Sequence, residues 1–196
     1  MRVVGGKWRG KPLEAPDGRA VTRPTTDRNR EAMASMILSA KGLDLAGCSV
    51  LDAFAGSGAM GIELLSRGAA RCTFFDRDRR AAARIRRNCA SVGAARDEYC
   101  VVAADVVASA AKGQVKGAPF DIVFLDPPYA MDAGAVSSLV ESLSSSGSLA
   151  LGAVVVYERS TDANGLSARG LVLKKSKRYG ITSVDLMKME GTVDEH

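Results

Sequence analysis

From residue 49 onward, short runs of apolar residues alternate with longer segments whose apolar residues recur at helical spacing. The runs are apolar throughout rather than at every second position, which is typical of strands buried on both faces. A repeated strand–helix order favours a parallel sheet. We therefore expect an α/β fold with a mostly parallel seven-stranded sheet and helices on both faces. The expected strands are 50–54, 72–75, 99–103, 121–125, 149–157, 171–175 and 182–189.

Helices are expected between these strands and also before the first strand. They are 60–67, 79–92, 106–111 and 136–143, preceded by a helix that begins near Asp27 and ends near Gly42. Ahead of that helix, short apolar pieces around Gly5-Gly6 and Pro12 predict a small β-hairpin. The chain is thus expected to divide into an N-terminal hairpin with a basic extension, residues 1–26, and a main domain, residues 27–196.

A chain of 196 residues, of which 46% are hydrophobic, can bury one substantial core. No apolar stretch reaches the roughly 20 residues that a membrane helix needs, and residues 1–6 lack the apolar core of a signal peptide. We therefore expect a cytoplasmic protein without a membrane partner. The four cysteines form no CxxC pair, and the single histidine is His196. Neither a metal site nor a histidine base is expected.

A glycine-rich loop joins the first expected strand to the helix that follows it. Gly56-Ser57-Gly58-Ala59-Met60-Gly61 matches the pattern G-x-G-x-x-G, and Asp76 lies 20 positions beyond Gly56 at the end of the next strand. Glycines let a ligand approach the backbone closely, and the acid can accept hydrogen bonds from ribose hydroxyls. The arrangement suits a cofactor that contains adenosine, either NAD or S-adenosylmethionine.

Acidic residues mark the ends of four successive strands: Asp52, Asp76, Asp105 and Asp126. Asp52 or Asp105 taken singly could be no more than a cap. Together the four indicate a ligand site, because the carboxyl ends of parallel strands meet at one edge of the sheet and ligands bind there. Asp52 would repel a pyrophosphate but could help to bind an ammonium or hydroxyl group, which favours S-adenosylmethionine over NAD.

Asp126-Pro127-Pro128-Tyr129 follows the apolar run 120–125. The Asp126 carboxylate and the Pro127 carbonyl can accept the two N–H bonds of a planar amine, and the Tyr129 ring can stack on the same substrate. A nucleobase or an amide has this shape. Asp and Pro are also ordinary residues of a tight turn, so the four residues alone leave both interpretations open.

Basic residues are concentrated near the N-terminus. Residues 1–31 contain eight Lys and Arg against four Asp and Glu, whereas the net charge of the whole chain is +5. This uneven distribution favours a polyanion as a partner, although a single surface Lys or Arg is usually just solvated.

The chain resembles class I S-adenosylmethionine-dependent methyltransferases with a D-P-P-Y motif, and most of all the RsmD family of bacterial 16S rRNA guanine-N2 methyltransferases. The resemblance rests on residues 52–58 and on the Asp126 motif. Its most specific parts are Gly5-Gly6-Lys7-Trp8-Arg9-Gly10 and Arg23-Pro24-Thr25-Thr26-Asp27-Arg28-Asn29-Arg30-Glu31. The resemblance implies a Rossmann-like fold, S-adenosylmethionine as the cofactor, and methylation of the exocyclic N2 amino group of a guanine in small-subunit rRNA.

The resemblance also implies roles for individual residues. The catalytic residues would be Asp126, Pro127, Pro128 and Tyr129, which place the guanine amino group. The cofactor-binding residues would be Asp52, Ala53, Phe54, Gly56, Gly58, Asp76, Arg77, Asp105 and Val106. Among these, the two glycines would cradle the methionine end of the cofactor and Asp105 would hold adenine. The family often has Glu at the ribose position, so either Asp76 or Asp78 would bind the ribose here.

Contacts with RNA are assigned to Lys7, Trp8, Arg9, Arg23, Arg28 and Arg30. The cationic side chains would contact phosphates, and Trp8 would offer a stacking surface. Alternatively, residues 23–31 cap their helix and pack over the cofactor site. The expected partner is 16S rRNA, within the small ribosomal subunit or an assembly intermediate, and we expect the protein to act as a monomer without a metal.

Three other functions stay open. An adenine-N6 methyltransferase acting on RNA or DNA would present a similar amino group to Asp126. An NAD-dependent oxidoreductase would use the same glycine loop, although the chain has no internal histidine. A non-catalytic RNA-binding module could have kept the fold. The sequence specifies neither the nucleotide that is modified nor the assembly state of the RNA substrate.

Overall fold

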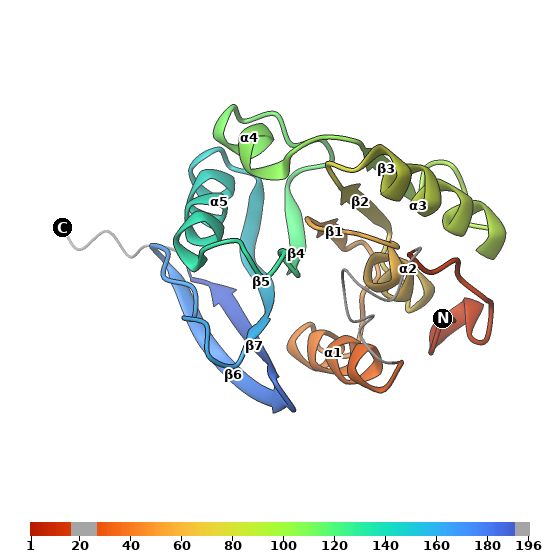
Figure 1. Cartoon of the computed structure of the whole chain (residues 1–196), viewed down its shortest axis with the longest axis horizontal. Coiled ribbons are helices and arrows are strands. Elements are labelled where there is room, and N and C mark those ends of the chain that lie inside the picture. Colours follow the sequence, from red (N-terminus) through yellow and green to blue (C-terminus); the bar gives the residue numbers. More distant parts are fainter. Residues whose placement is uncertain (17–26, 191–196) are drawn as a thin grey trace.

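The computed structural model describes residues 1–16 and 27–190. Its centre is a seven-stranded sheet with the order β3-β2-β1-β4-β5-β7-β6 (Figure 1). The strands are β1 (Ser49–Asp52), β2 (Arg71–Phe75), β3 (Tyr99–Val102), β4 (Phe120–Leu125), β5 (Leu149–Ser160), β6 (Leu171–Tyr179) and β7 (Thr182–Met189). Strands β1 to β5 are parallel to one another, and β7 runs antiparallel to both β5 and β6. The predicted α/β fold with a mostly parallel seven-stranded sheet is confirmed.

The helices occupy the expected connections. They are α1 (Asp27–Ala40), α2 (Ala59–Ser66), α3 (Arg79–Val92), α4 (Val106–Ala111) and α5 (Ala133–Ser145), with a 3-10 turn η1 (Gly6–Trp8) near the N-terminus. The carboxylates of Asp78, Asp105 and Asp132 accept backbone N–H bonds of 2.8 to 3.0 Å in the first turns of α3, α4 and α5. Such caps satisfy donors that a helix leaves unpaired at its start. Within residues 1–16 and 27–190, no helix is long and apolar enough to cross a membrane.

Two strands are longer than the sequence predicts. β5 continues to Ser160 and β6 to Tyr179, past the expected ends at residues 157 and 175. The additional residues are mostly polar or charged, so they lack the apolar signal of a buried strand. They form strand because they pair with β7, where Ser160 and Tyr179 both lie opposite Thr182.

Helices cover both faces of the sheet (Figure 1). The core on one face lies beneath α1, α2 and α3, and the core on the other face lies beneath α4 and α5. Successive strand residues alternate between the two: Phe124 in β4 and Val156 in β5 belong to the first core, whereas Leu125 and Tyr157 belong to the second. The same alternation determines which face of the sheet the side chains after Leu125 and Tyr157 point to.

The N-terminal segment packs on α2. An antiparallel bridge pairs Arg2 with Pro12, and η1 lies between them, so the expected hairpin has a single bridge. Trp8 is buried in the core beneath α1, α2 and α3. The buried carboxylate of Glu63 accepts 2.8 Å hydrogen bonds from two consecutive backbone N–H groups, those of Val4 and Gly5. Residues 1–16 therefore share a core with the sheet.

Candidate active site

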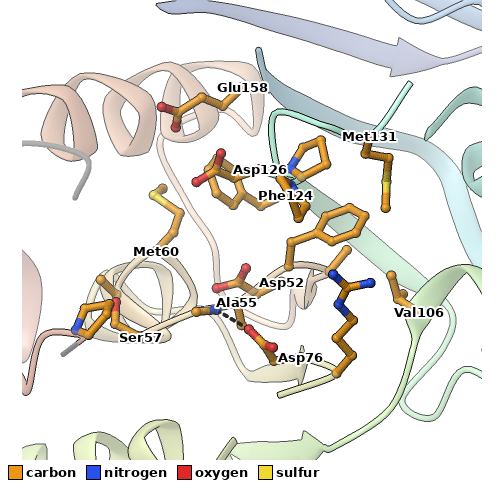
Figure 2. A pocket seen from close by; sticks show the side chains of 18 of the residues that line it. Asp52, Ala55, Ser57, Met60, Asp76, Val106, Phe124, Asp126, Met131 and Glu158 are labelled. Atoms are coloured by element: carbon orange, nitrogen blue, oxygen red, sulfur yellow. Dashed lines mark hydrogen bonds between the residues drawn. The ribbon is translucent and has the colours of Figure 1, made fainter. Parts of the chain in front are cut away.

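A cavity of about 540 Å³ opens at the carboxyl ends of the parallel strands. The order of the strands reverses between β1 and β4, and crevices at such points are where open α/β sheets bind ligands. Asp126 and Glu158 lie at one end of the cavity and Asp76 at the other, with Asp52 between them (Figure 2). The position of the cavity agrees with the expectation from the acidic strand ends.

The structure brings most of the predicted site residues together. Those lining the cavity are Asp52, Ala53, Phe54, Gly56, Asp76, Arg77, Asp105, Val106, Asp126, Pro127, Pro128 and Tyr129. Gly58 lies outside this lining, and its contact with the cofactor stays a prediction. Gly58 instead precedes α2 with a φ of 76°, and a Cβ atom there would lie 3.1 Å from Ile85 in α3. Glycine at this position lets the start of α2 pack closely against α3.

The other two glycines of the loop have separate tasks. Gly56 has a φ of 56°, a conformation that glycine adopts without strain, and its bare backbone lines the cavity. Gly61 lies in the first turn of α2 against β2, where a Cβ atom would be 2.3 Å from the ring of Phe74. Gly56 is therefore the glycine of this loop that lines the cavity, and Gly61 permits close packing of helix on strand.

Asp52 is buried at the end of β1, and its Oδ2 atom accepts a 3.0 Å hydrogen bond from the backbone N–H of Gly61. Burial raises the pKa of Asp52 to about 7, helped by the nearby charge of Asp76 and opposed by this hydrogen bond. A cationic group entering the cavity beside Asp52 would favour the ionised carboxylate.

Asp76 and Asp78 differ in position. Asp76 lines the cavity, and its Oδ2 atom accepts a 2.8 Å hydrogen bond from the backbone N–H of Gly56 (Figure 2). Asp78 does not line the cavity, because its carboxylate caps α3. Asp76 is therefore the better placed of the two for a ribose. Asp105 both caps α4 and lines the cavity, so capping is compatible with the predicted contact to adenine.

Asp126 follows β4 on the cavity wall. It is open to solvent within the cavity, yet the surrounding protein desolvates its carboxyl group and raises its pKa well above the usual range. The negative charges of Glu158 and Asp52 raise the pKa further. Tyr129 is 67% exposed, so an incoming planar group can reach its ring.

Sequence reasoning missed several residues of the cavity wall, among them Glu158, Met33, Met60, Phe124 and Met131. Glu158 had a usable signal, because it follows the apolar run of β5 just as Asp126 follows that of β4. The apolar residues gave no such signal, since side chains of this kind fill cores as readily as they line pockets.

Two of the residues predicted to bind RNA, Trp8 and Arg30, are buried. Trp8 is only 7% exposed and packs in the core, so it offers no stacking surface, and its prediction is corrected. Arg30 is 2% exposed and donates 2.6 Å hydrogen bonds to the Arg2 carbonyl and the Asp27 carboxylate, so its guanidinium holds α1 to the N-terminal segment rather than facing solvent.

The remaining predictions of RNA contacts concern four cations. Arg9 and Arg28 are exposed. Lys7 is exposed too, but its ammonium pairs with Glu98 and lies 4.4 Å from the centre of the Trp8 ring. Arg23 lies outside the described residues.

Within the described part of the chain, no group of three or more His, Cys, Asp or Glu side chains is arranged to hold a metal ion. Most of the predicted catalytic and cofactor groups meet in one cavity, which has Asp126 and Glu158 at one end, Asp76 at the other and Asp52 between them.

Comparisons with known proteins agree with this geometry. The family described as conserved hypothetical protein 95 matches residues 1–188. The chain is 36% identical to ribosomal RNA small subunit methyltransferase D of Escherichia coli over 85% of this chain and 77% of that protein. It is 30% identical to the protein of the same name from Haemophilus influenzae, over 95% of this chain and 92% of that one.

A solved structure shows the same fold. The structure of the protein yhhF from Escherichia coli superimposes with a TM-score of 0.82 at 30% sequence identity, covering 98% of this chain and 99% of that chain. The two relatives described above are both called methyltransferases, which favours this interpretation of the glycine loop over an NAD-dependent oxidoreductase. The chain belongs to the RsmD family of Rossmann-like methyltransferases.

Proposed function

We propose that this protein transfers a methyl group from S-adenosylmethionine to the exocyclic N2 amino group of a guanine in 16S rRNA. The observation that carries the proposal is one cavity lined both by the Asp126 motif and by the glycine loop with Asp76. A planar amine held by the Asp126 motif would meet a cofactor held by the glycine loop and Asp76. Relatives called ribosomal RNA small subunit methyltransferase D support this class of RNA.

The residues of the cavity fit S-adenosylmethionine. A volume of about 540 Å³ is within the usual range of roughly 300 to 1,000 Å³ for ligand pockets. Asp76 would accept hydrogen bonds from the ribose, Asp105 from the adenine amino group, and Asp52 would lie near the cationic methionine end. When bound, the cofactor supplies an electrophilic methyl group, which leaves its sulfur as the new bond to nitrogen forms.

Asp126 would make the amino group reactive. The N2 atom of guanine is a weak nucleophile because its lone pair is delocalised into the ring. Accepting its two N–H bonds at the Asp126 carboxylate and the Pro127 carbonyl favours a pyramidal nitrogen and fixes its direction. The carboxylate also stabilises the positive charge that develops on nitrogen. Its raised pKa suits Asp126 to receive the departing proton and to pass it to water.

The RNA would lie over the side of the cavity on which α1 packs. Arg28 is exposed on α1, the helix that contributes Met33 to the cavity wall, and Arg9 is exposed in the N-terminal segment. These cations would contact phosphates and position a folded element of the RNA, while Tyr129 stacks on the target base. All the groups invoked come from one chain, so we propose a monomer acting on the small subunit or on an assembly intermediate.

The test is the transfer of labelled methyl from S-adenosylmethionine to small ribosomal subunits that lack the modification, followed by digestion and identification of the labelled nucleoside. N2-methylguanosine is the expected product. N6-methyladenosine would move the target to adenine and refute the base assignment. Absence of label in every RNA tested, despite cofactor binding, would refute the proposed substrate.

A further inference from the structure

Glu158 lies beside Asp126 on the neighbouring strand. β4 and β5 are parallel and Leu125 pairs with Tyr157, so Asp126 and Glu158 occupy the next equivalent positions. Leu125 and Tyr157 point into the core beneath α4 and α5, so the residues that follow point to the opposite face, and both line the cavity. Figure 2 shows the two carboxyl groups at the same end of the cavity.

Two carboxylates on adjacent strands repel each other, and the charge of Glu158 contributes to the raised pKa of Asp126. Asp52, which is also acidic, and Arg30 from α1, whose guanidinium pairs with Asp27, line the same cavity. A ligand that donates hydrogen bonds to both carboxyl groups relieves the repulsion. The pair therefore favours a base with neighbouring N–H donors.

Guanine has such donors and adenine does not. The Watson–Crick edge of guanine presents N1–H next to the N2 amino group, whereas adenine presents the acceptor N1 next to its N6 amino group. A base taken out of its stack is commonly recognised through this edge. A carboxylate facing N1 of adenine would place two acceptors against each other, and unpaired polar groups in an enclosed site are costly.

We propose that Glu158 accepts the N1–H of the target guanine while Asp126 accepts an N2–H, and that Glu158 thereby selects guanine over adenine. The inference rests on the proposed methylation of guanine and names the residue that determines the choice of base. Glu158 is thus a specificity residue, whereas Asp126 and Pro127 act on the nitrogen that receives the methyl group.

The experiment replaces the target guanine by 2-aminopurine, which keeps the amino group at C2 but has an acceptor at N1. Small subunits are reconstituted with either base at the methylated position, and kcat/KM is measured for the wild-type protein and for Glu158→Gln. The wild-type protein should prefer guanine by about 10- to 100-fold, the worth of a hydrogen bond to a charged group. The preference of Glu158→Gln should be lower by about 10-fold or more, because its amide can donate to N1 of 2-aminopurine.

Glu141→Gln is the matched control, since Glu141 is exposed on α5, which packs on the other face of the sheet. This variant should keep the wild-type preference. An equal preference in the wild-type protein and Glu158→Gln would overturn the inference. So would weaker cofactor binding by Glu158→Gln with an unchanged base preference, because Glu158 would then serve the cofactor. Failure of the wild-type protein to methylate guanine is a separate result, which overturns the proposed function itself.

Discussion

The Oδ2 atom of Asp52 accepts a 3.0 Å hydrogen bond from the backbone N–H of Gly61, which joins the end of β1 to the first turn of α2. Asp52 is buried and its pKa is raised to about 7, so its ionised form is unfavourable in the folded protein without a ligand. A cationic ligand would offset this cost. A cationic ligand in the cavity would therefore also stabilise the fold.

Asp52→Asn should change how stability depends on pH. Because the folded protein holds this proton more tightly than the unfolded chain, the contribution of Asp52 to stability is lost as pH rises from about 4, the usual pKa of Asp, to about 7. The variant has no such loss. Relative to wild type, it should gain roughly 2 to 3 kcal/mol in unfolding free energy between pH 5 and pH 8. Denaturant unfolding at the two pH values measures the difference.

Asp97→Asn removes an exposed carboxylate and serves as the control, with little relative change expected across this range. If Asp52→Asn followed the wild-type dependence, the buried carboxyl group would not be the cause. Asp52→Asn should also bind S-adenosylmethionine more weakly, as measured by calorimetry, because a neutral amide no longer attracts a cation.

Gly61→Ala should destabilise the fold by about 1 to 3 kcal/mol, the usual cost of overpacking a core. A Cβ atom at this position would lie 2.3 Å from the Phe74 ring and 2.7 Å from the Cys72 sulfur, so β2 or α2 must shift. Thermal unfolding tests this. Gly165→Ala is the control, because its Cβ atom would lie at an ordinary contact distance of 3.7 Å from the Asp185 carboxylate. Equal stability of the two variants would show that α2 and β2 can adjust freely.

Asp126→Ala should lower methyl transfer by about 10²- to 10³-fold, since it removes the acceptor that orients and stabilises the reacting amine. Cofactor affinity should stay close to that of wild type, because the proposed cofactor contacts lie elsewhere in the cavity. Asp126→Asn keeps an acceptor oxygen without the charge and should have intermediate activity. Single-turnover rates and cofactor titrations separate the two effects, and full turnover by Asp126→Ala would refute the proposed role.

Arg28→Glu should weaken binding of the RNA substrate. Loss of a phosphate contact should also lower the slope of log affinity against log salt concentration by about 1. Filter binding at several salt concentrations measures both quantities. Arg96→Glu makes the same charge change at an exposed site between α3 and β3 and should have less effect. Affinities of Arg28→Glu that match wild type at every salt concentration would place the RNA on another surface.

Local pattern predicted much of this protein. The apolar runs gave the seven strands, because burial on both faces of a parallel sheet requires apolar residues at successive positions. The sequence also indicated that Asp52, Asp76, Asp105 and Asp126 would share one edge of the sheet, since parallel strands place their carboxyl ends together. These conclusions need only neighbouring residues and the direction of the strands.

Tertiary structure alone decided how distant segments meet. Trp8 was predicted to bind RNA from its planar ring and Arg30 from its charge, yet both side chains are buried by packing on the core. The glycine pattern did not reveal that Gly58 faces Ile85 in α3. The pairing of Leu125 with Tyr157 brings Asp126 and Glu158 together across a long separation in sequence. Register and helix packing depend on the whole fold, because they are fixed by contacts between residues that no local pattern connects.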